Sequence, residues 1–316
     1  MFFLHSVLYL IILSRSFLKE NKMTGEKKNI EDSFSDVFCP TCGPNEERTR
    51  IFERKDGITF YNCSSCNIEY ASPRLVESSL LNLYEGDSWR DMSYYENWTY
   101  QNWKKEKGKD FFLVQENIKL AKIFLNPGAS ILDVGCDIGL TVKALEECGY
   151  YSEGIEVSKV GSKIAKEKTG IKVQNLKLED YKSDKKFDGV FLLDVLEHLN
   201  DPVQVLIECA NNLTRGGYIF LHTPHHRGIS TRYKKYLHKK GLKNDYKHFG
   251  FPEHLYAFDK KSLKAMLNKA GFETLHFESW PNQLTRGKIN IFNYYVVKLI
   301  KFFSLSDYIV CVGKKK

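Results

Sequence analysis

The 316-residue sequence lacks the features that mark several protein classes. It has no low-complexity tract, no internal repeat and no collagen-like or mucin-like bias. At 42% hydrophobic, 14% aromatic and 27% charged residues, its composition is that of an ordinary soluble globular protein. Its length and composition exclude a disordered chain and a peptide hormone. At about 150 residues per domain, the length suggests one large domain with an appendage or two modest domains.

A hydrophobic run long enough to cross a membrane is also missing. The apolar residues from 2 to 13 fall short of the about 20 that a spanning helix needs. No charged residue precedes the run and no small-residue cleavage site follows it, so it fits a signal peptide poorly. We expect residues 1–36 to be an N-terminal apolar or disordered segment. Three interpretations stay open: a natural start at Met23, a membrane-touching anchor from residues 1–18, or simple disorder.

The net charge of +8, from 47 basic and 39 acidic residues, is spread unevenly along the chain. Basic residues concentrate between His222 and Glu253 and again between Arg286 and Lys316. Such clusters can meet nucleic acid, an anionic membrane or a phosphorylated substrate, but the commonest interpretation of a lysine-rich run is a solvated loop or helix face.

Four of the eight cysteines form two CxxC pairs, separated by the twenty residues 43–62: Cys39, Cys42, Cys63 and Cys66. Two facing turns of this kind can complete a tetrahedral thiolate shell around zinc. A segment of residues 37–73 is too small to build much core, so the metal would supply its folding energy. Because four thiolates leave no position for a catalytic water, we predict a structural zinc ribbon, with redox use or chance as alternatives. Free thiolates also favour a reducing compartment.

An alternating pattern of strands and helices starts after residue 126. We predict strands at 131–134, 151–156, 171–174, 187–194, 217–222, 273–279 and 307–313, with helices at 139–148, 159–169, 202–213 and 260–270. This order indicates an α/β fold with a doubly wound, Rossmann-like seven-stranded sheet that binds its ligand at the carboxyl ends of the strands. Residues 74–125 have helical spacing and many aromatics, and we expect them to form a helical cap between the ribbon and this domain of residues 126–316.

The turn from Asp133 to Gly139 leaves a strand and opens a helix. Its glycines let a ligand approach bare backbone, and the helix start offers free N–H donors. A GxGxxG dinucleotide fingerprint would need glycine at Asp137 and Leu140, so that interpretation fails. Glu156 ends the next strand, where a carboxylate can accept from both hydroxyls of a ribose. The segments FDGVFLLDVLEHLNDP and LTRGGYIFLHTP follow in order.

Together, these four ordered segments resemble the class I S-adenosylmethionine-dependent methyltransferases over about residues 110–280 and the closing strand. The resemblance implies that the methionine end of S-adenosylmethionine is held at Asp133, Gly135, Cys136 and Gly139, and its ribose at Glu156. It implies adenine contacts around Leu178, Glu179 and Asp180, and closure beneath the sulfonium by Leu193 and Asp194. The family usually has glycine where this chain has Asp137, but aspartate tolerates a left-handed backbone better than most residues.

Two narrower resemblances point in different directions. LDVLEHLNDP is similar to the ubiquinone-pathway O-methyltransferases, which implies a divalent metal at Asp194, Glu197 and His198, although a structural helix start is the more common role of this triplet. The four-cysteine module, a short PRL segment and the aromatic cap resemble the front of sugar methyltransferases from polysaccharide and antibiotic clusters. Those enzymes carry a further carboxy-terminal domain that does not fit within this chain.

Methyl transfer to a hydroxyl needs a base near the strand ends, and imidazole suits that role. The candidates are His222 and His226, next to the predicted fifth strand, and His254, in a PEHL segment that resembles the border of the substrate pocket in relatives. Any one of them is more often a hydrogen-bonded loop residue. We expect residues 222–256 to form a basic lid that can hold an anionic acceptor. Residues 286–304 should form a helical insertion that packs as core or, through 289–303, lies on a membrane.

The sequence therefore predicts a cytoplasmic methyltransferase that uses S-adenosylmethionine and structural zinc and acts on a hydroxyl of a small molecule or glycan precursor. Peripheral membrane contact through residues 1–18 or 289–303 stays open. An RNA-binding or RNA-methylating protein is the alternative, but the ribbon is near charge balance and no NPPY-type motif is present, so nucleic acid is disfavoured as a partner. A degenerate cofactor fold with a structural role is a third hypothesis.

Overall fold

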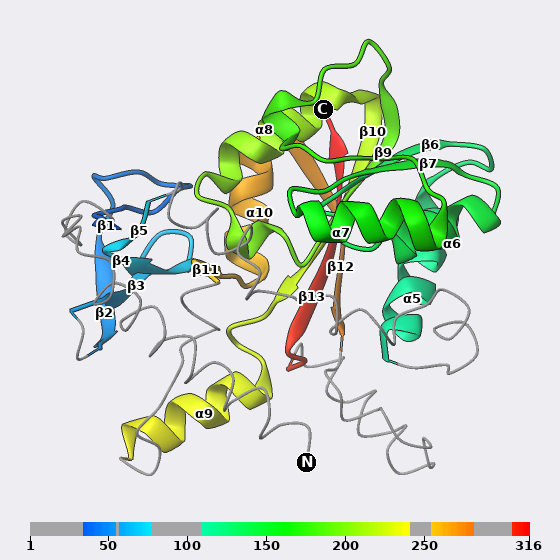
Figure 1. Cartoon of the computed structure of the whole chain (residues 1–316). Coiled ribbons are helices and arrows are strands. Elements are labelled where there is room, and N and C mark those ends of the chain that lie inside the picture. The colour runs from blue at the N-terminus through cyan, green and yellow to red at the C-terminus, as the bar shows by residue number, and fades with distance from the viewer. Residues whose placement is uncertain (1–33, 55–56, 77–108, 241–253, 281–304) are drawn as a thin grey trace, which may run out of the picture.

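The computed structural model describes residues 34–54, 57–76, 109–240, 254–280 and 305–316 (Figure 1). Its largest element is a seven-stranded sheet in the order β12-β13-β10-β9-β6-β7-β8. The strands are β6 (Ser130–Val134), β7 (Tyr151–Ile155), β8 (Val173–Gln174), β9 (Phe187–Leu193), β10 (Leu213–Pro224), β12 (Phe272–Trp280) and β13 (Tyr308–Lys315). The first five run parallel, whereas β13 pairs antiparallel with β10 and β12. The predicted Rossmann-like α/β fold is confirmed.

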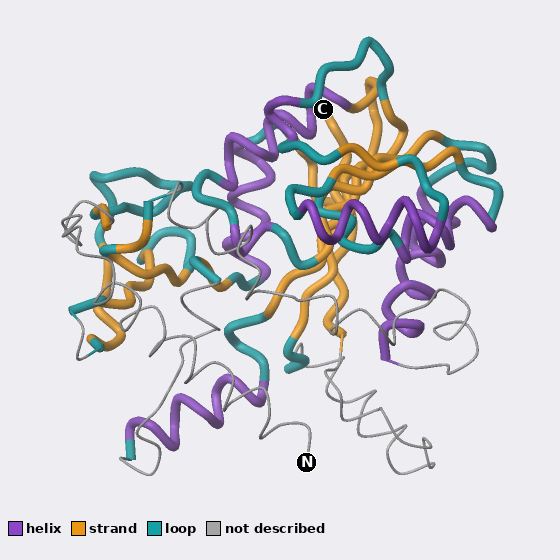
Figure 2. The backbone as a smooth tube through the Cα atoms, in the orientation of Figure 1, coloured by secondary structure: helices purple, strands orange, loops and turns teal. Residues whose placement is uncertain are grey.

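Helices alternate with these strands, as Figure 2 shows. They are α5 (Lys109–Phe124), α6 (Leu140–Glu147), α7 (Lys159–Ile164), α8 (Pro202–Asn212), α9 (Ile229–Lys239) and α10 (Lys260–Lys269). Local sequence fixes their starts: Asp201 caps α8, and Asp259 and Ser262 form a reciprocal capping box at α10. The helix predicted at 159–169 changes at Ala165 into one π-helical turn that ends at Thr169.

Alternate residues of the central strands point to opposite sides, and both sides are buried. On β9, Val190 and Leu192 belong to the core that packs against α8 and α10, whereas Phe191 stacks on Phe220 of β10 in the core that packs against α5 and α6. Because the residues that face each side of the sheet are both apolar, the sequences of these strands are continuous hydrophobic runs.

The four-cysteine region forms a second, smaller sheet. Its strands β2 (Arg48–Glu53), β3 (Thr59–Cys63) and β4 (Glu69–Ser72) pair antiparallel in sequence order. The fourth strand, β11 (Tyr256–Ala257), comes from the far end of the predicted lid and pairs with the edge of β4. A separate pair, β1 (Phe34–Ser35) with β5 (Arg74–Leu75), closes the ends of the segment. The ribbon core, including Cys63 and Tyr70, is continuous with the core under α10.

Several predicted segments lie wholly or partly outside the described residues. These are residues 1–33 of the N-terminal segment, 77–108 of the helical cap, 241–253 of the lid and 286–304 of the insertion. Within the described part, α5 occupies the end of the cap and α9 the middle of the lid. None of the described helices is both long enough and apolar enough to cross a bilayer.

Candidate functional site

The turn after β6 has the backbone that close ligand approach requires. Gly135, Asp137 and Gly139 have φ values of 73°, 49° and 75°, so the left-handed conformation recurs at every second residue. A Cβ on Gly135 would lie 2.6 Å from Val195, and one on Gly139 would lie 2.1 Å from Ile171. Side chains therefore cannot be added there without displacing neighbours. Asp137 adopts a left-handed conformation itself, which aspartate tolerates better than most residues.

Glu156 follows β7, and its side chain stabilises this turn through hydrogen bonds to the backbone. Its buried carboxylate accepts hydrogen bonds from the backbone N–H of Asp137 and of Ser158, both at 2.8 Å. One bond fixes the glycine turn and the other fixes the start of α7. The carboxylate is thus fixed at the end of β7, where the resemblance implies that the ribose is held.

Asp133 and Cys136 are both buried at the end of β6. Burial, together with the charge of Glu156, raises the pKa of Asp133 to about 8. Burial also raises the pKa of the Cys136 thiol. The thiol packs closely against Gly154 of β7, where an added Cβ would lie only 2.4 Å from its Sγ. Asp133 therefore offers a carboxyl that a cation would ionise. The main chain of Cys136 is used within the turn, because its N–H donates to the Ile155 carbonyl and its carbonyl accepts from the Gly139 N–H.

The predicted adenine contacts lie on a single 3-10 turn, Leu178–Asp180. Leu178 is buried in the core, whereas Glu179 and Asp180 are exposed. Leu178 is thus the apolar member of the three and packs into the core, while the exposed surface of this turn comes from Glu179 and Asp180.

Asp194 and His222 form a pair at the carboxyl ends of β9 and β10, next to Leu193. Oδ1 of Asp194 lies 2.8 Å from Nδ1 of His222, and the backbone N–H of Asp194 donates to the His222 carbonyl at 2.9 Å. Desolvation tends to raise the pKa of Asp194, but the charges of His222 and of other nearby histidines bring it below its usual value. Asp194 has a left-handed φ of 56°, which aims its carboxylate at the ring.

The surroundings of His222 fix its orientation. The ring stacks on Tyr308 at 4.8 Å between centroids and lies 5.6 Å from Trp280. Its Nε2 has no hydrogen-bond partner within the described ranges, and the side chain is 3% exposed. The expectation that residue 222 opens the lid was wrong, because β10 continues to Pro224 and His222 lies inside the strand.

Glu197, His198 and His254 form a second group, with ligand atoms that all lie within 4.8 Å of one another. Burial and the charge of Asp194 raise the pKa of Glu197 well above its usual value, and Thr223 donates to its Oε2 at 3.0 Å. The rings of His198 and His254 meet edge to face at 4.6 Å. Of the trio that the resemblance implied, Glu197 and His198 lie together with His254. Asp194 pairs with His222 but remains near enough for its charge to act on Glu197 and His198.

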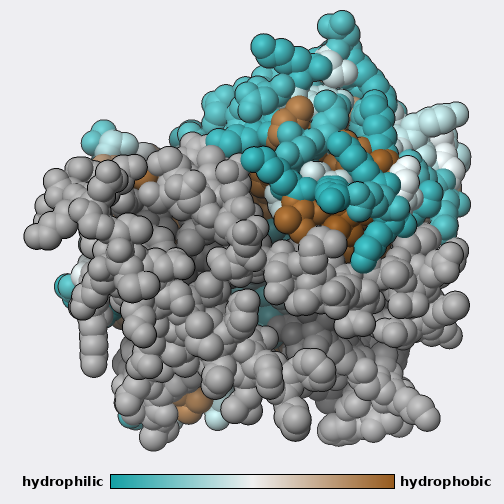
Figure 3. Space-filling view, in the orientation of Figure 1, coloured by the Kyte–Doolittle hydropathy of each residue, from teal (hydrophilic) through white to brown (hydrophobic). Residues whose placement is uncertain are grey.

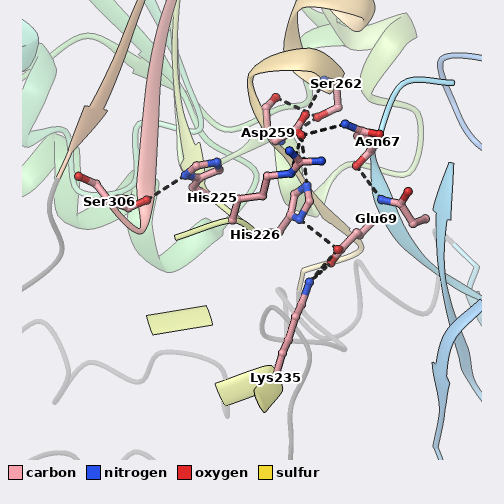
Figure 4. A network of polar contacts seen from close by, with 10 residues as sticks. Asn67, Glu69, His225, His226, Lys235, Asp259, Ser262 and Ser306 are labelled. Carbon is pink, nitrogen blue, oxygen red and sulfur yellow. Dashed lines mark hydrogen bonds and ion pairs between the residues drawn. The ribbon is translucent and has the colours of Figure 1, made fainter. Parts of the chain in front are cut away.

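His226 lies apart from these groups, in a buried contact between the ribbon and the sheet (Figure 4). Its Nδ1 is 3.0 Å from Glu69 of β4, and its Nε2 is 3.8 Å from Asp259, the cap of α10. Lys235 of α9 also binds Glu69, at 2.7 Å, and Arg227 binds Asp259 at 3.0 Å. His226 therefore lies between β4 of the four-cysteine sheet and the N-terminal cap of α10. This network was not predicted from the sequence, although Asp259 and Ser262 have the spacing of a helix capping box.

The four cysteines of the ribbon converge as their spacing predicts. Their sulfur atoms all lie within 4.8 Å of one another, and the backbone N–H of Cys42 donates to Sγ of Cys39 at 3.3 Å. None of the eight cysteines of the chain forms a disulfide. Four thiols at this separation have the number and type of ligands that structural zinc requires.

Comparison with known proteins identifies the family. Residues 110–277 match a family profile described as a methyltransferase domain. Because the match covers more than half of the chain, the protein belongs to this methyltransferase family. It is an S-adenosylmethionine-dependent enzyme of class I, as the four ordered motifs indicated.

Individual relatives are more distant. Ubiquinone biosynthesis O-methyltransferase from Xanthomonas campestris pv. campestris is 28% identical over 173 residues, which are 50% of this chain and 70% of the relative. The protein of the same name from Thiobacillus denitrificans is 31% identical over 103 residues, 30% of this chain and 44% of the relative. Among solved structures, magnesium protoporphyrin IX methyltransferase from Synechocystis PCC 6803 with bound SAH has 16% identity and a TM-score of 0.47, covering 65% of this chain and 82% of that chain.

Proposed function

We propose that this enzyme methylates a hydroxyl group of a small molecule or glycan precursor, with His222 as the general base. The observation that carries the proposal is the Asp194–His222 pair, which joins the end of β9 to the neighbouring parallel strand β10 beside the glycine turn. The curated relatives are named as O-methyltransferases, which supports oxygen as the acceptor atom.

In this mechanism, residues at the strand ends bind and orient the cofactor. The Asp133 carboxylate would pair with the ammonium of the methionine end, and the Glu156 carboxylate would accept from the ribose hydroxyls. Leu178 would cover one face of the adenine, and Leu193 with Asp194 would close the site beneath the sulfur. When bound, S-adenosylmethionine supplies an activated methyl group on a sulfonium that leaves as a neutral thioether.

His222 would take the proton of the acceptor hydroxyl. Because Asp194 holds Nδ1, the ring presents Nε2 as its free base, and the carboxylate stabilises the imidazolium that forms. With S-adenosylmethionine bound, the deprotonated acceptor oxygen would take its methyl group, and His222 would release the proton to solvent afterwards. His254 lies beside Glu197 and His198, where it would border the acceptor.

The test is production of S-adenosylhomocysteine from S-adenosylmethionine with a panel of hydroxyl, amine and carbon acceptors, anionic ones included. Turnover confined to hydroxyl acceptors supports the proposal. Turnover of amine or carbon acceptors alone overturns it, and so does failure to bind S-adenosylmethionine in calorimetry.

We further propose that Cys39, Cys42, Cys63 and Cys66 bind one structural zinc ion in a ribbon domain, ahead of a methyltransferase domain that starts with α5. Metal analysis should find about one zinc per chain, given a closed four-thiolate shell. Cys63→Ser should lower the zinc content, whereas Cys148→Ser, at an exposed cysteine outside the cluster, should not. Equal zinc content in both variants would contradict this site. Free cysteines throughout the chain suit the reducing cytoplasm that we propose as its location.

A further inference from the structure

Helix α9 exposes a stripe of large side chains. Ile229, Tyr233 and Tyr236 are 45%, 61% and 55% exposed. At positions i, i+4 and i+7, these three residues lie on one face of the helix. Figure 3 shows a few hydrophobic atoms at the surface on the lower left. Figure 1 places α9 in that part of the view. We call these three residues the α9 stripe.

Basic residues border the α9 stripe, and the helix contains no acidic residue. Arg232 lies one turn before Tyr236, and Lys240 lies one turn after it; both are exposed. The Lys240 Nζ is 6.0 Å from the centroid of the Tyr236 ring. The stripe is therefore an apolar and aromatic strip beside a positive rim.

Contacts on other sides of the helix hold this face outward. Lys235 turns to the ribbon and binds both carboxylate oxygens of Glu69, at 2.7 and 2.8 Å. At the helix start, the Ile229 N–H donates to the Leu305 carbonyl at 2.8 Å, and the Ser230 N–H donates to Asp307 at 3.1 Å. The helix is thus fixed at its beginning and near its middle, while the α9 stripe faces solvent.

We propose that the α9 stripe docks the enzyme on an anionic lipid surface. Tyrosines favour the membrane–water interface because the ring is apolar and the hydroxyl stays hydrated. A helix with an apolar strip, a basic rim and no acidic residue fits the plane of such an interface, and anionic headgroups supply the complementary charge. The contact is peripheral and reversible, and it is distinct from the earlier expectations for residues 1–18 and 289–303.

Flotation of the full chain with vesicles tests the proposal. The protein should float with vesicles of phosphatidylcholine and phosphatidylglycerol, remain free with phosphatidylcholine alone, and be released by high salt. Tyr233→Ala with Tyr236→Ala should abolish most of the binding. Arg232→Gln and Lys240→Gln should each weaken it about fivefold, since one basic residue near an anionic surface contributes about that factor.

Tyr151→Ala is the matched control, because Tyr151 is 72% exposed at the start of β7, away from α9. It should float like the natural sequence. All variants should keep their affinity for S-adenosylmethionine, which shows that they are folded. Absence of flotation with anionic vesicles overturns the proposal, and so does flotation that the tyrosine replacements leave unchanged. Tighter binding to RNA than to vesicles, lost in the same variants, would identify nucleic acid as the partner instead.

Discussion

Buried carboxyl groups in two regions of this enzyme have different charged neighbours. At the strand ends, the charge that acts on buried Asp133 is another carboxylate, that of Glu156, and the pKa of Asp133 is raised to about 8. Between the ribbon and the sheet, buried Glu69 is met by Lys235 and His226. In the first region, burial and the neighbouring carboxylate keep Asp133 protonated near neutral pH, and a cationic ligand can stabilise its ionised form. In the second region, the charge of Glu69 is balanced by the protein itself. The comparison contrasts the cofactor site that we propose with a contact whose charges are paired within the protein.

Replacing His222 should give the largest effect on activity. His222→Ala should lower turnover about 10²- to 10⁴-fold, because it removes the base, while binding of S-adenosylmethionine in calorimetry stays nearly unchanged. His276→Ala is the control, since His276 also faces a carboxylate, Glu278 at 3.7 Å, but lies on β12. Equal activity of the two variants would show that His222 is not the base.

Replacing Glu69 should affect stability instead. Glu69→Ala leaves Lys235 and the buried His226 without their shared partner, so we expect the free energy of unfolding to fall by about 3 kcal/mol. Denaturant titration measures this loss. Glu146→Ala, which removes a surface pair with Lys143, should change stability by less than about 0.5 kcal/mol. A loss at Glu69 no larger than at Glu146 would mean that the ribbon contact contributes little.

Asp133 should make cofactor binding depend on pH. Its pKa in the folded protein, about 8, lies above the ordinary value of 3.8, so the folded chain keeps a proton that the unfolded chain has released. Stability from this group is therefore full below about pH 4 and is lost as the pH rises to about 8. An ammonium ligand favours the ionised carboxylate, so its affinity should rise by up to about tenfold per pH unit below pH 8.

Calorimetric titration with S-adenosylmethionine across this pH range measures that slope. Asp133→Asn should bind more weakly and lose the Asp133 part of the pH dependence. An identical slope in both proteins would place the titrating group elsewhere.

Asp137→Gly should give the smallest effect. Glycine adopts a φ of 49° without the steric cost that aspartate carries, so the variant should be more stable by up to about 1 kcal/mol. Thermal unfolding measures the change. A clear loss of stability would show that the aspartate side chain supports the turn more than its backbone strains it.

The sequence predicted the seven strands of the main sheet and the helices α6, α7, α8 and α10 because their apolar periods are strong and local. It did not predict α9, which lies in the segment expected to be a basic lid. Four cysteines at zinc spacing and the glycine turn were predictable for the same reason. The pairing of β11 with β4 was not, because two residues carry no period and their partner strand is remote in sequence. Nor did the sequence separate His222 from His226. The two histidines are four residues apart near the end of β10, and the extension of the strand to Pro224 brings His222 to Asp194 and leaves His226 beyond the strand, at the ribbon.

The β4–β11 pairing also sets an order of events during synthesis. The cysteines and β4 leave the ribosome early, but the edge of β4 gains its partner only when Tyr256 has emerged. Until then the nascent ribbon presents an open strand edge and the apolar surface of Tyr70, both of which invite contact with other chains. Early capture of metal by the four cysteines would hold the unfinished ribbon in shape while the rest of the enzyme is made.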